Sequence, residues 1–468
     1  MPQEKTSTMG SPQYLLINLQ ELAQEVVDRA MRAGATDAEV VIREGDEFST
    51  LVRLGQVETL KESGGRGIGL RVFSGLRNAS TSSSDLSPEG LDHLVKGAME
   101  LVRVTSEDPF AGLPGPRAFG QTQGGSDGKL DLYYEDVAAL PVAERIEYAQ
   151  RAEAAAMATD TRIQNSDGGS FDAGTARKIL ANSRGFVGEY QRSYCSISAM
   201  PIAQDAEGGM QRDYWYSSGR TLSKLETPES IGAEAGRRTL RRLNARRVPT
   251  QRVPIVFAPE IARSIVGNIF DAANGDSIYR GASFWANQLG KKVASENVTV
   301  VDDGTIPGGF GTSPFDGEGL PTRRKMIIEK GVLKNYLLNT YTARKLNMES
   351  TGNASRGLAG SPGIGGGNIY LENGTLSLEE LLRDVPAGLY VTELMGFGVN
   401  LVTGDYSRGA SGLWIENGEL TYAVEEITIA GNLKEMLNNI TAIGNDLEFR
   451  GAVVSPTLRI DGMTIAGE

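Results

Sequence analysis

Glycine recurs at short intervals along the whole chain, 58 times in 468 residues, and its frequency limits the folds open to the protein. An ordinary globular protein contains about 7% glycine. Glycine weakens helix interiors but accepts the positive φ angles of tight turns, so the excess favours many short connections between strands. We therefore expect a strand-rich α+β protein.

The periodicity of apolar residues divides the chain into three folded regions. Residues 13–106 combine two helices with several strand-like runs, which is typical of an N-terminal α/β region with antiparallel sheets flanked by helices. A Pro- and Gly-rich linker, 107–130, leads to a middle α+β region, 131–249. Residues 250–468 are dominated by strands and predict a β-rich, barrel-like domain, whereas the polar tail 1–12 is expected to be disordered.

Several glycine-containing steps are typical of hairpin turns between apolar runs. Asp167–Gly169 and Gly185 would close hairpins in the middle region, and Lys330–Gly331 and Asn417–Gly418 would do so in the last region. Ser126–Lys129 matches the S-x-x-K pattern of acyl-transfer enzymes. Its Gly-rich surroundings favour an accidental match over a catalytic one.

The charge balance argues against nucleic acid as a partner. The chain has 47 basic and 59 acidic residues, a formal net charge of −12, which repels a polyanion. One basic stretch, Arg237–Arg247, interleaves arginines with apolar residues. We interpret it as the solvated face of an amphipathic helix.

Neither secretion nor membrane insertion is indicated. The N-terminal segment has no basic region, its apolar run is only YLLI, and no stretch approaches the ~18 apolar residues of a transmembrane helix. A single cysteine, Cys195, excludes an intrachain disulfide and fits a reducing compartment. The sequence therefore predicts a cytoplasmic protein with no membrane partner.

The scarcity of histidine restricts the possible hydrolytic chemistry. His93 is the single histidine, and it falls on the polar side of a helix whose other side is apolar. A catalytic zinc site takes three protein ligands, usually rich in histidine, and a Ser-His-Asp or Cys-His site needs an imidazole beside its nucleophile. One histidine and one cysteine about a hundred residues apart supply neither kind of site.

Oxygen ligands and glycine-rich loops offer other kinds of site. Asp302, Asp303, Asp316 and Glu318 could together bind Mg²⁺ or Ca²⁺, but their spacing matches no known ligand loop. GIGGGN, residues 363–368, resembles a dinucleotide-binding loop only in its glycines, because a strand-like run rather than a helix follows it. We expect no metal or nucleotide site at either place.

Long motifs near the end of the chain resemble a known family. VTELMGFGVNLVTGDYSRGASGLWIENGELTYAVEEITIAGN is similar to the C-terminal domain of the TldD/PmbA family, in its PmbA or TldE branch. SPFDGEGLPTRRKMIIEKGVLKNYLLN and SDGGSFDAGTA add to the resemblance, which covers nearly the whole chain. The resemblance implies a cytoplasmic peptidase assembly. In it, a TldD subunit with the zinc motif H-E-x-x-x-H and a further Cys ligand forms a heterodimer with TldE and degrades unfolded peptides.

The zinc motif of the family is degenerate in this chain. Counting back from RGASFWANQLG, its His, Glu and His fall on Val266, Gly267 and Asp271, and only Asp271 could bind a metal. The resemblance therefore implies a subunit with no cofactor and no catalytic residue of its own, with zinc held by a TldD-like partner. Two alternatives stay open. The chain could be a stand-alone peptidase of unrecognised mechanism, or a non-catalytic homodimer that binds peptides or regulates another protein.

The loop VNLVTGDYSRGASG, residues 399–412, supplies most of the candidate residues for contact with a peptide. We predict a peptide groove that contains Glu393, Asn400, Asp405, Arg408 and Ser411. An exposed strand edge can pair with any peptide backbone, and Arg408 could hold a peptide carboxylate. In the alternative interpretation, Asp405 and Arg408 pair with each other and brace the hairpin.

Overall fold

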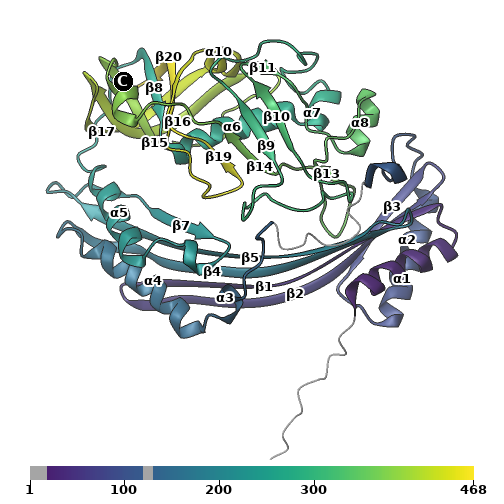
Figure 1. Cartoon of the computed structure of the whole chain (residues 1–468). Coiled ribbons are helices and arrows are strands. Elements are labelled where there is room, and N and C mark those ends of the chain that lie inside the picture. Colours follow the sequence, from purple (N-terminus) through teal and green to yellow (C-terminus); the bar gives the residue numbers. More distant parts are fainter. Residues whose placement is uncertain (1–17, 120–129, 468) are drawn as a thin grey trace, which may run out of the picture.

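A computed structural model describes residues 18–119 and 130–467. The chain forms a long antiparallel sheet with helices on one face and a strand-rich C-terminal domain over the other face (Figure 1). The tail at 1–12, residues 120–129 of the expected linker and Ser126 of the S-x-x-K match lie outside the described residues.

The sheet joins the N-terminal and middle regions. Its strand order is β3-β2-β1-β4-β5-β6, and β7 also pairs with β5. The central pairing, between β1 and β4, runs antiparallel from Glu39 opposite Asn182 to Val52 opposite Gly169. The strands are β1 (Asp37–Arg53), β2 (Gln56–Ser74), β3 (Arg77–Ser83), β4 (Ile163–Asn182), β5 (Val187–Gln204), β6 (Met210–Arg212) and β7 (Trp215–Gly219).

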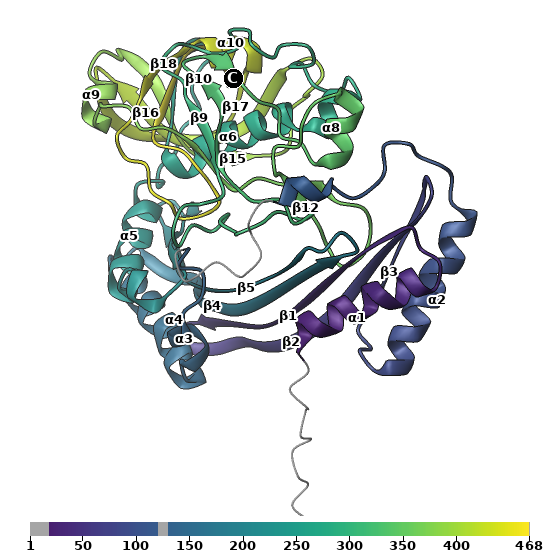
Figure 2. The same cartoon turned by 45° about the vertical axis from the view of Figure 1, so that its right-hand side comes forward.

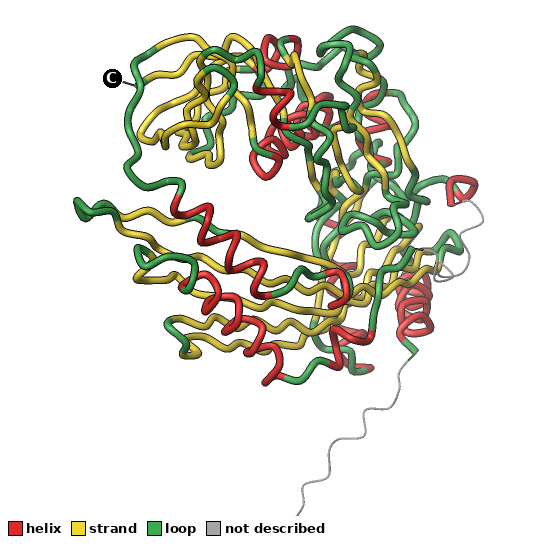
Figure 3. Tube along the Cα trace, turned by 60° about the vertical axis from the view of Figure 1, so that its left-hand side comes forward, coloured by secondary structure: helices red, strands yellow, loops and turns green. Residues whose placement is uncertain are grey.

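Alternation along the strands assigns each face of this sheet to a different neighbour. Val40 and Ile42 pack with helices α1 and α2, whereas Val41 packs with Phe315 of the C-terminal domain. Figure 3 shows two further helices side by side along the sheet. The helices of this layer are α1 (Leu19–Arg32), α2 (Pro88–Val104), α3 (Glu135–Ala139), α4 (Val142–Met157) and α5 (Pro228–Leu240).

Two interpretations from the middle region need correction. Gly185 does occupy the β4–β5 turn, but Asp167–Gly169 lies inside β4, where the pairing register shifts by a bulge. Gly168 has the positive φ of 116° that the bulge uses, and Gly169 leaves room for the backbone of α4. The hairpin prediction was wrong there because glycine serves bulges and close helix contacts as well as turns.

The arginine-rich stretch is only partly solvated. Helix α5 ends at Leu240, and Thr227 caps its start by accepting the N–H of Ser230. Arg238 is 6% exposed, and its guanidinium lies 2.8 Å from the carboxylate of Glu260. The prediction of a solvated face is wrong for Arg238, because the C-terminal domain covers that side of α5 and supplies a counter-charge.

The C-terminal domain contains the predicted barrel. Strands β17, β16, β15, β8 and β20 follow one another, and a further pairing of β17 with β20 closes the ring. The Asn417–Gly418 turn joins β16 to β17 as expected, with positive φ at both residues. The strands are β8 (Gln251–Phe257), β15 (Ala387–Met395), β16 (Asp405–Glu416), β17 (Glu419–Asn432), β18 (Ile440–Ile443) and β20 (Leu458–Ala466).

A second sheet and short helices complete this domain around one apolar core. The Lys330–Gly331 turn is confirmed between β10 and β11. The sheet strands are β11 (Val332–Leu333), β10 (Arg324–Glu329), β9 (Val300–Asp303), β14 (Asn368–Leu371) and β19 (Val453–Val454), with β12 (Ala354–Ser355) and β13 (Gly363–Ile364) as a separate pair. The helices are α6 (Pro259–Ala273), α7 (Gly275–Tyr279), α8 (Thr340–Leu346), α9 (Leu378–Leu382) and α10 (Leu433–Asn438).

The loop after β12 ties the two layers together (Figure 2). Glu39 of β1 is 1% exposed and lies between two guanidinium groups, at 3.2 Å from Arg71 of β2 and 2.8 Å from Arg356 of this loop. A Cβ on Gly69 would stand only 1.7 Å from the carbonyl oxygen of Leu358. A buried ion pair and a close backbone contact therefore fix the C-terminal domain on the sheet.

Within the two described ranges, no helix combines the length and the apolar character that crossing a membrane requires.

Candidate functional site: a cationic cavity between the layers

A cavity of about 900 Å³ lies between the sheet and the C-terminal domain, and we call it the interlayer cavity. Strands β1, β2, β4 and β5 form one wall, and the loops 304–317, 352–358 and 365–367 form the other. Each of the motifs SGGRG, DGEG and GIGGGN contributes glycines to this lining: Gly64, Gly65, Gly67, Gly317, Gly365, Gly366 and Gly367. These motifs, far apart in the sequence, therefore have one shared location.

Cations dominate the sheet wall of the interlayer cavity. Arg43 of β1 stands directly opposite Lys178 of β4, which stands directly opposite Tyr190 of β5. Arg192 lies two residues beyond Tyr190 and thus on the same face of β5. Like charges directly opposite each other destabilise a sheet, so this row carries an electrostatic cost.

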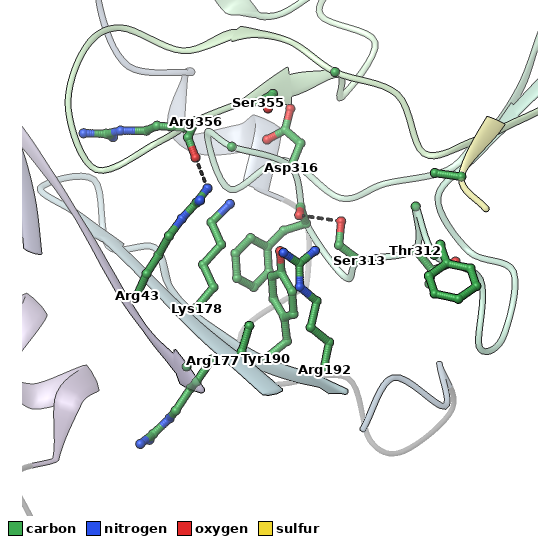
Figure 4. Close-up of a pocket in the computed structure, with 18 of the residues that line it drawn as sticks. Arg43, Arg177, Lys178, Tyr190, Arg192, Thr312, Ser313, Asp316, Ser355 and Arg356 are labelled. Carbon is green, nitrogen blue, oxygen red and sulfur yellow. Dashed lines mark hydrogen bonds between the residues drawn. The ribbon is translucent and has the colours of Figure 1, made fainter. Parts of the chain in front are cut away.

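The three cations reach into the same space (Figure 4). Arg43 donates to the backbone carbonyl of Arg356. Within residues 18–119 and 130–467, Lys178 and Arg192 have neither a hydrogen bond nor an ion pair. Burial, followed by the charge of Arg43, lowers the pKa of Lys178 to about 8. The side chain of Arg177, by contrast, points away from this space.

The nearest carboxylate on the opposite wall does not neutralise this cluster by hydrogen bonding. Asp316 is 5% exposed, and its two oxygens accept the backbone N–H groups of Glu318 (2.8 Å), Leu320 (2.9 Å) and Ala354 (3.0 Å). Burial raises the pKa of Asp316. Its attraction for Lys178 is therefore a through-space effect only.

The predicted groove residues lie elsewhere, and two of them line a second cavity. Glu393 and Arg408 face a space of about 590 Å³ where α5 and α6 meet β15 and β16. Glu393 pairs with Arg242. The Nε of Arg408 and the hydroxyl of Tyr406 are buried without a hydrogen bond of good geometry. Burial raises the pKa of Tyr406 to about 12, against the opposing effect of the neighbouring Arg408. Ser411 stands opposite Glu393 in the strand pairing and is 4% exposed.

Asn400 lies in the β15–β16 connection and Asp405 begins β16, and neither residue lines either cavity. The Asn400 side chain accepts two backbone N–H groups of the turn. Asp405 accepts the Thr403 hydroxyl at 2.6 Å and the Asn432 amide at 3.1 Å, and these bonds lower its pKa. The alternative interpretation, a pairing of Asp405 with Arg408, is therefore wrong, because Thr403 and Asn432 engage the Asp405 carboxylate instead.

The residues at the zinc-motif positions do not fit a zinc ion. On α6, Val266 is 1% exposed within the apolar core, Gly267 has no side chain, and Asp271 lies at the surface. His93 is exposed on α2, and Cys195 is buried in β5, where burial raises its pKa to about 12. Among the residues that the structure describes, no three His, Cys, Asp or Glu side chains are grouped to hold a metal.

The carboxylates considered as oxygen ligands are engaged by donors of the chain itself. Asp302 accepts the ammonium of Lys325 at 2.8 Å, and Asp303 accepts a hydroxyl and a backbone N–H within its own turn. Glu318 accepts the hydroxyl and N–H of Thr340 at 2.6 and 2.9 Å, and burial raises the pKa of Glu318 to about 8. These side chains thus stabilise the Gly-rich loops of the cavity wall.

Sequence reasoning did not single out the cations of the interlayer cavity. Arg43, Lys178 and Arg192 stand in the runs VIREG, ARKIL and YQRSY, which match no motif. One sequence pattern could have indicated them: a charged residue two positions from a buried apolar residue lies on the same face of a strand. Val41 and Arg43 are one such pair, and Lys178 and Leu180 are another. Only the pairing of strands shows that these charges meet.

Three family models match most of the chain. The PmbA/TldA metallopeptidase domain 1 matches residues 38–102, the central domain 135–243 and the C-terminal domain 250–467. Metalloprotease PmbA of Escherichia coli O157:H7 is 40% identical over 453 residues, which cover 96% of this chain and 97% of that protein.

Solved structures have the same architecture. A crystal structure from Bacteroides thetaiotaomicron, described as a candidate modulator of DNA gyrase, superposes with a TM-score of 0.88 at 29% identity and covers 96% of this chain and 99% of its own. TldE from Thermococcus kodakarensis, at 21% identity, has a TM-score of 0.83 over 95% of this chain and all of its own, and so supports the fold alone.

Proposed function

The chain belongs to the PmbA/TldD metallopeptidase family, and on that premise we propose that it is a PmbA/TldE-like subunit without a zinc site. Zinc and catalysis would reside in a TldD-like partner with which it forms a heterodimer. The substrates would be unfolded peptides, and the location the cytoplasm.

The chemistry of α6 carries this proposal. Zinc needs nitrogen, sulfur or carboxylate ligands in a tetrahedral arrangement. Val266 and Gly267 offer no ligand atom, and the apolar core that encloses Val266 leaves no place for an ion. Enzymes lower a reaction barrier by at least ~8 kcal/mol. Among the described residues we find neither ligands for a metal-bound water nor an activated nucleophile that could supply this stabilisation.

An open strand edge supports peptide as the ligand. Strand β3 pairs with β2 only from Ile68 to Ser74, so the preceding half of β2, 56–67, pairs on one side only. This half is exposed at nearly every residue. The unpaired N–H and C=O groups of such an edge can bind an extended peptide backbone of any sequence.

Metal analysis and a peptidase assay test the proposal. The purified chain is expected to contain no stoichiometric zinc and to leave an unfolded protein such as azocasein intact. Addition of a TldD-like partner should give a one-to-one complex by size exclusion with light scattering, and cleavage should then appear. Near-equimolar zinc with chelator-sensitive cleavage by the chain alone would overturn the proposal. If the chain forms a homodimer and does not bind the TldD-like partner, the alternative of a non-catalytic peptide-binding or regulatory protein is favoured instead.

Arg408 is the groove residue best placed for contact with a peptide. Arg408 lines the second cavity and forms no ion pair within the described residues, so a peptide carbonyl or carboxylate could accept from its guanidinium. In the complex, Arg408→Ala is expected to slow peptide turnover. Arg212→Ala serves as the matched control, because Arg212 lines the same cavity but pairs with Asp167. Equal turnover by both variants would reject the contact.

A further inference from the structure

We propose that Arg43, Lys178 and Arg192 form a carboxylate-binding subsite of the interlayer cavity that holds an acidic group of the peptide. The acidic group is the C-terminal carboxylate or the side chain of an Asp or Glu. This inference rests on the proposed peptide-binding function and adds a substrate preference to it.

The first argument is the missing counter-charge. Other cations of the lining have carboxylate partners: Arg177 lies 2.5 Å from Glu189, and Lys325 lies 2.8 Å from Asp302. In the described part of the chain, Arg43, Lys178 and Arg192 form no ion pair, and the carboxylate of Asp316, which attracts Lys178 through space, is held by three backbone N–H groups. A chain that pairs its cations elsewhere in the same cavity but leaves three together provides for a negative charge from outside.

The second argument is the geometry of the three donors. They come from three adjacent strands, and the direct β1–β4 and β4–β5 pairings hold their backbones in place. Two guanidinium groups and one ammonium on a rigid sheet match the two oxygens of a carboxylate with little loss of side-chain freedom. The lowered pKa of Lys178 agrees with a site whose charge is stabilised only when an anion arrives.

The third argument is the route into the cavity. Residues 56–67 of β2 pair with β1 only and leave the other edge free. The end of this segment, Ser63–Gly67, lines the interlayer cavity. A peptide that pairs with this edge would therefore carry its end or a side chain directly to the cations. Gly64, Gly65 and Gly67 have no side chains that could obstruct its backbone.

A peptide carboxylate fits the cavity better than phosphate does. No helix begins in the Gly-rich loops of the lining, so the oriented N–H groups of a helix N-terminus are missing from this wall. The overall charge of −12 also disfavours polyphosphates. A single carboxylate on an otherwise uncharged peptide needs no helix N-terminus, and the overall negative charge repels it less than a polyphosphate.

Binding of three related peptides tests the subsite. Each is a ten-residue peptide of Ala, Thr and Gln labelled at its N-terminus with an uncharged BODIPY fluorophore: one with a free C-terminal carboxylate, one amidated with a single internal Glu, and one amidated and neutral. Fluorescence anisotropy with the full chain, alone and in the partner complex, should show one or both acidic peptides binding about tenfold more tightly than the neutral one. The difference between the first two identifies which carboxylate is preferred.

Variants connect the preference to the cations. Lys178→Met and Arg43→Gln are each expected to remove most of the tenfold preference, measured as the ratio of the affinities for the acidic and the neutral peptide. Lys96→Met, which removes one charge from the exposed face of α2, is the matched control and should keep the preference for acidic peptides. Arg43→Gln serves if Lys178→Met does not fold, and the melting temperature of each variant is measured beside its affinity.

The outcomes separate this inference from the proposed function. If no peptide binds, the peptide-binding role itself is rejected. If all three bind equally, or if both variants keep the preference, only the carboxylate subsite is rejected. Competition by inorganic phosphate at concentrations far below those of acetate would also overturn it, because the site would then be one for phosphate.

Discussion

Replacing Lys178 by Met should make the protein more stable at neutral pH, although the change removes a charged group from a polar cavity. The pKa of Lys178 is lowered from 10.5 to about 8 in the folded protein. Below pH 8 the ammonium is charged in both the folded and the unfolded state. The folded state then carries the full free-energy cost of burying this charge beside other cations. At 1.36 kcal/mol for each tenfold change this amounts to about 3 kcal/mol, which we reduce to about 2 kcal/mol because water in the cavity screens part of the penalty.

The pH dependence distinguishes this penalty from a packing effect. As pH rises from 8 to about 10.5, the folded protein loses the proton while the unfolded chain keeps it, so the wild type becomes more stable relative to Lys178→Met. The advantage of the variant should therefore fall from about 2 kcal/mol at pH 7 toward zero near pH 10.5. The charged and titratable groups that face Lys178 are Arg43 of β1, Tyr190 and Arg192 of β5, and Asp316 and Arg356 of the C-terminal domain.

Urea unfolding of both proteins at pH 7 and pH 10 measures the effect as a difference in the free energy of unfolding. Lys96→Met, at an exposed position on α2, should differ from wild type by less than about 0.5 kcal/mol at either pH. A Lys178→Met protein that is less stable at pH 7, or equally stabilised at pH 7 and pH 10, would refute the electrostatic reasoning. The same variant is expected to bind acidic peptides more weakly, so stability and binding should change in opposite directions.

Three further outcomes are expected. Gly69→Ala should lower the free energy of unfolding by about 1–3 kcal/mol because its Cβ would meet a backbone oxygen at 1.7 Å. Gly65→Ala on the same strand has nothing within 4 Å and should stay within about 0.5 kcal/mol, and equal losses in urea unfolding would contradict the proposed contact. Glu39→Gln should cost about 3–5 kcal/mol in the same assay, since two buried guanidinium groups would lose their counter-charge, and a loss below about 1 kcal/mol would show that the pair is dispensable. Iodoacetamide at pH 8 should alkylate Cys195 of the native protein about 1,000-fold more slowly than that of the urea-unfolded chain, as followed by mass spectrometry, because burial raises its pKa to about 12; comparable rates would place the thiol at the surface.

The architecture followed from the sequence where local signals were strong. Two helices were expected within residues 13–106, and α1 and α2 form there because capping residues such as Asn18 and Ser87 and apolar periodicity act over a few residues. The turns at Lys330–Gly331 and Asn417–Gly418 were predictable for the same reason. Asp167–Gly169 was not, because a bulge in a long strand and a hairpin turn use the same residues, and only the partner strand distinguishes them.

The candidate sites also differ in whether local sequence or long-range strand pairing determines them. The proposal of a subunit without zinc depends on the presence of one histidine and one cysteine, which is a property of composition that no fold can change. The interlayer cavity is a property of strand register: Arg43 and Lys178 are 135 positions apart, and they meet because β1 pairs with β4 in one register. A shift of one residue would turn one of these charges toward the helices. Thus the amino-acid sequence by itself determined how few imidazole and thiol groups the chain can offer as ligands, since these are counted in residues. Only the tertiary structure decided where the uncompensated charges gather, since that depends on pairing between distant segments.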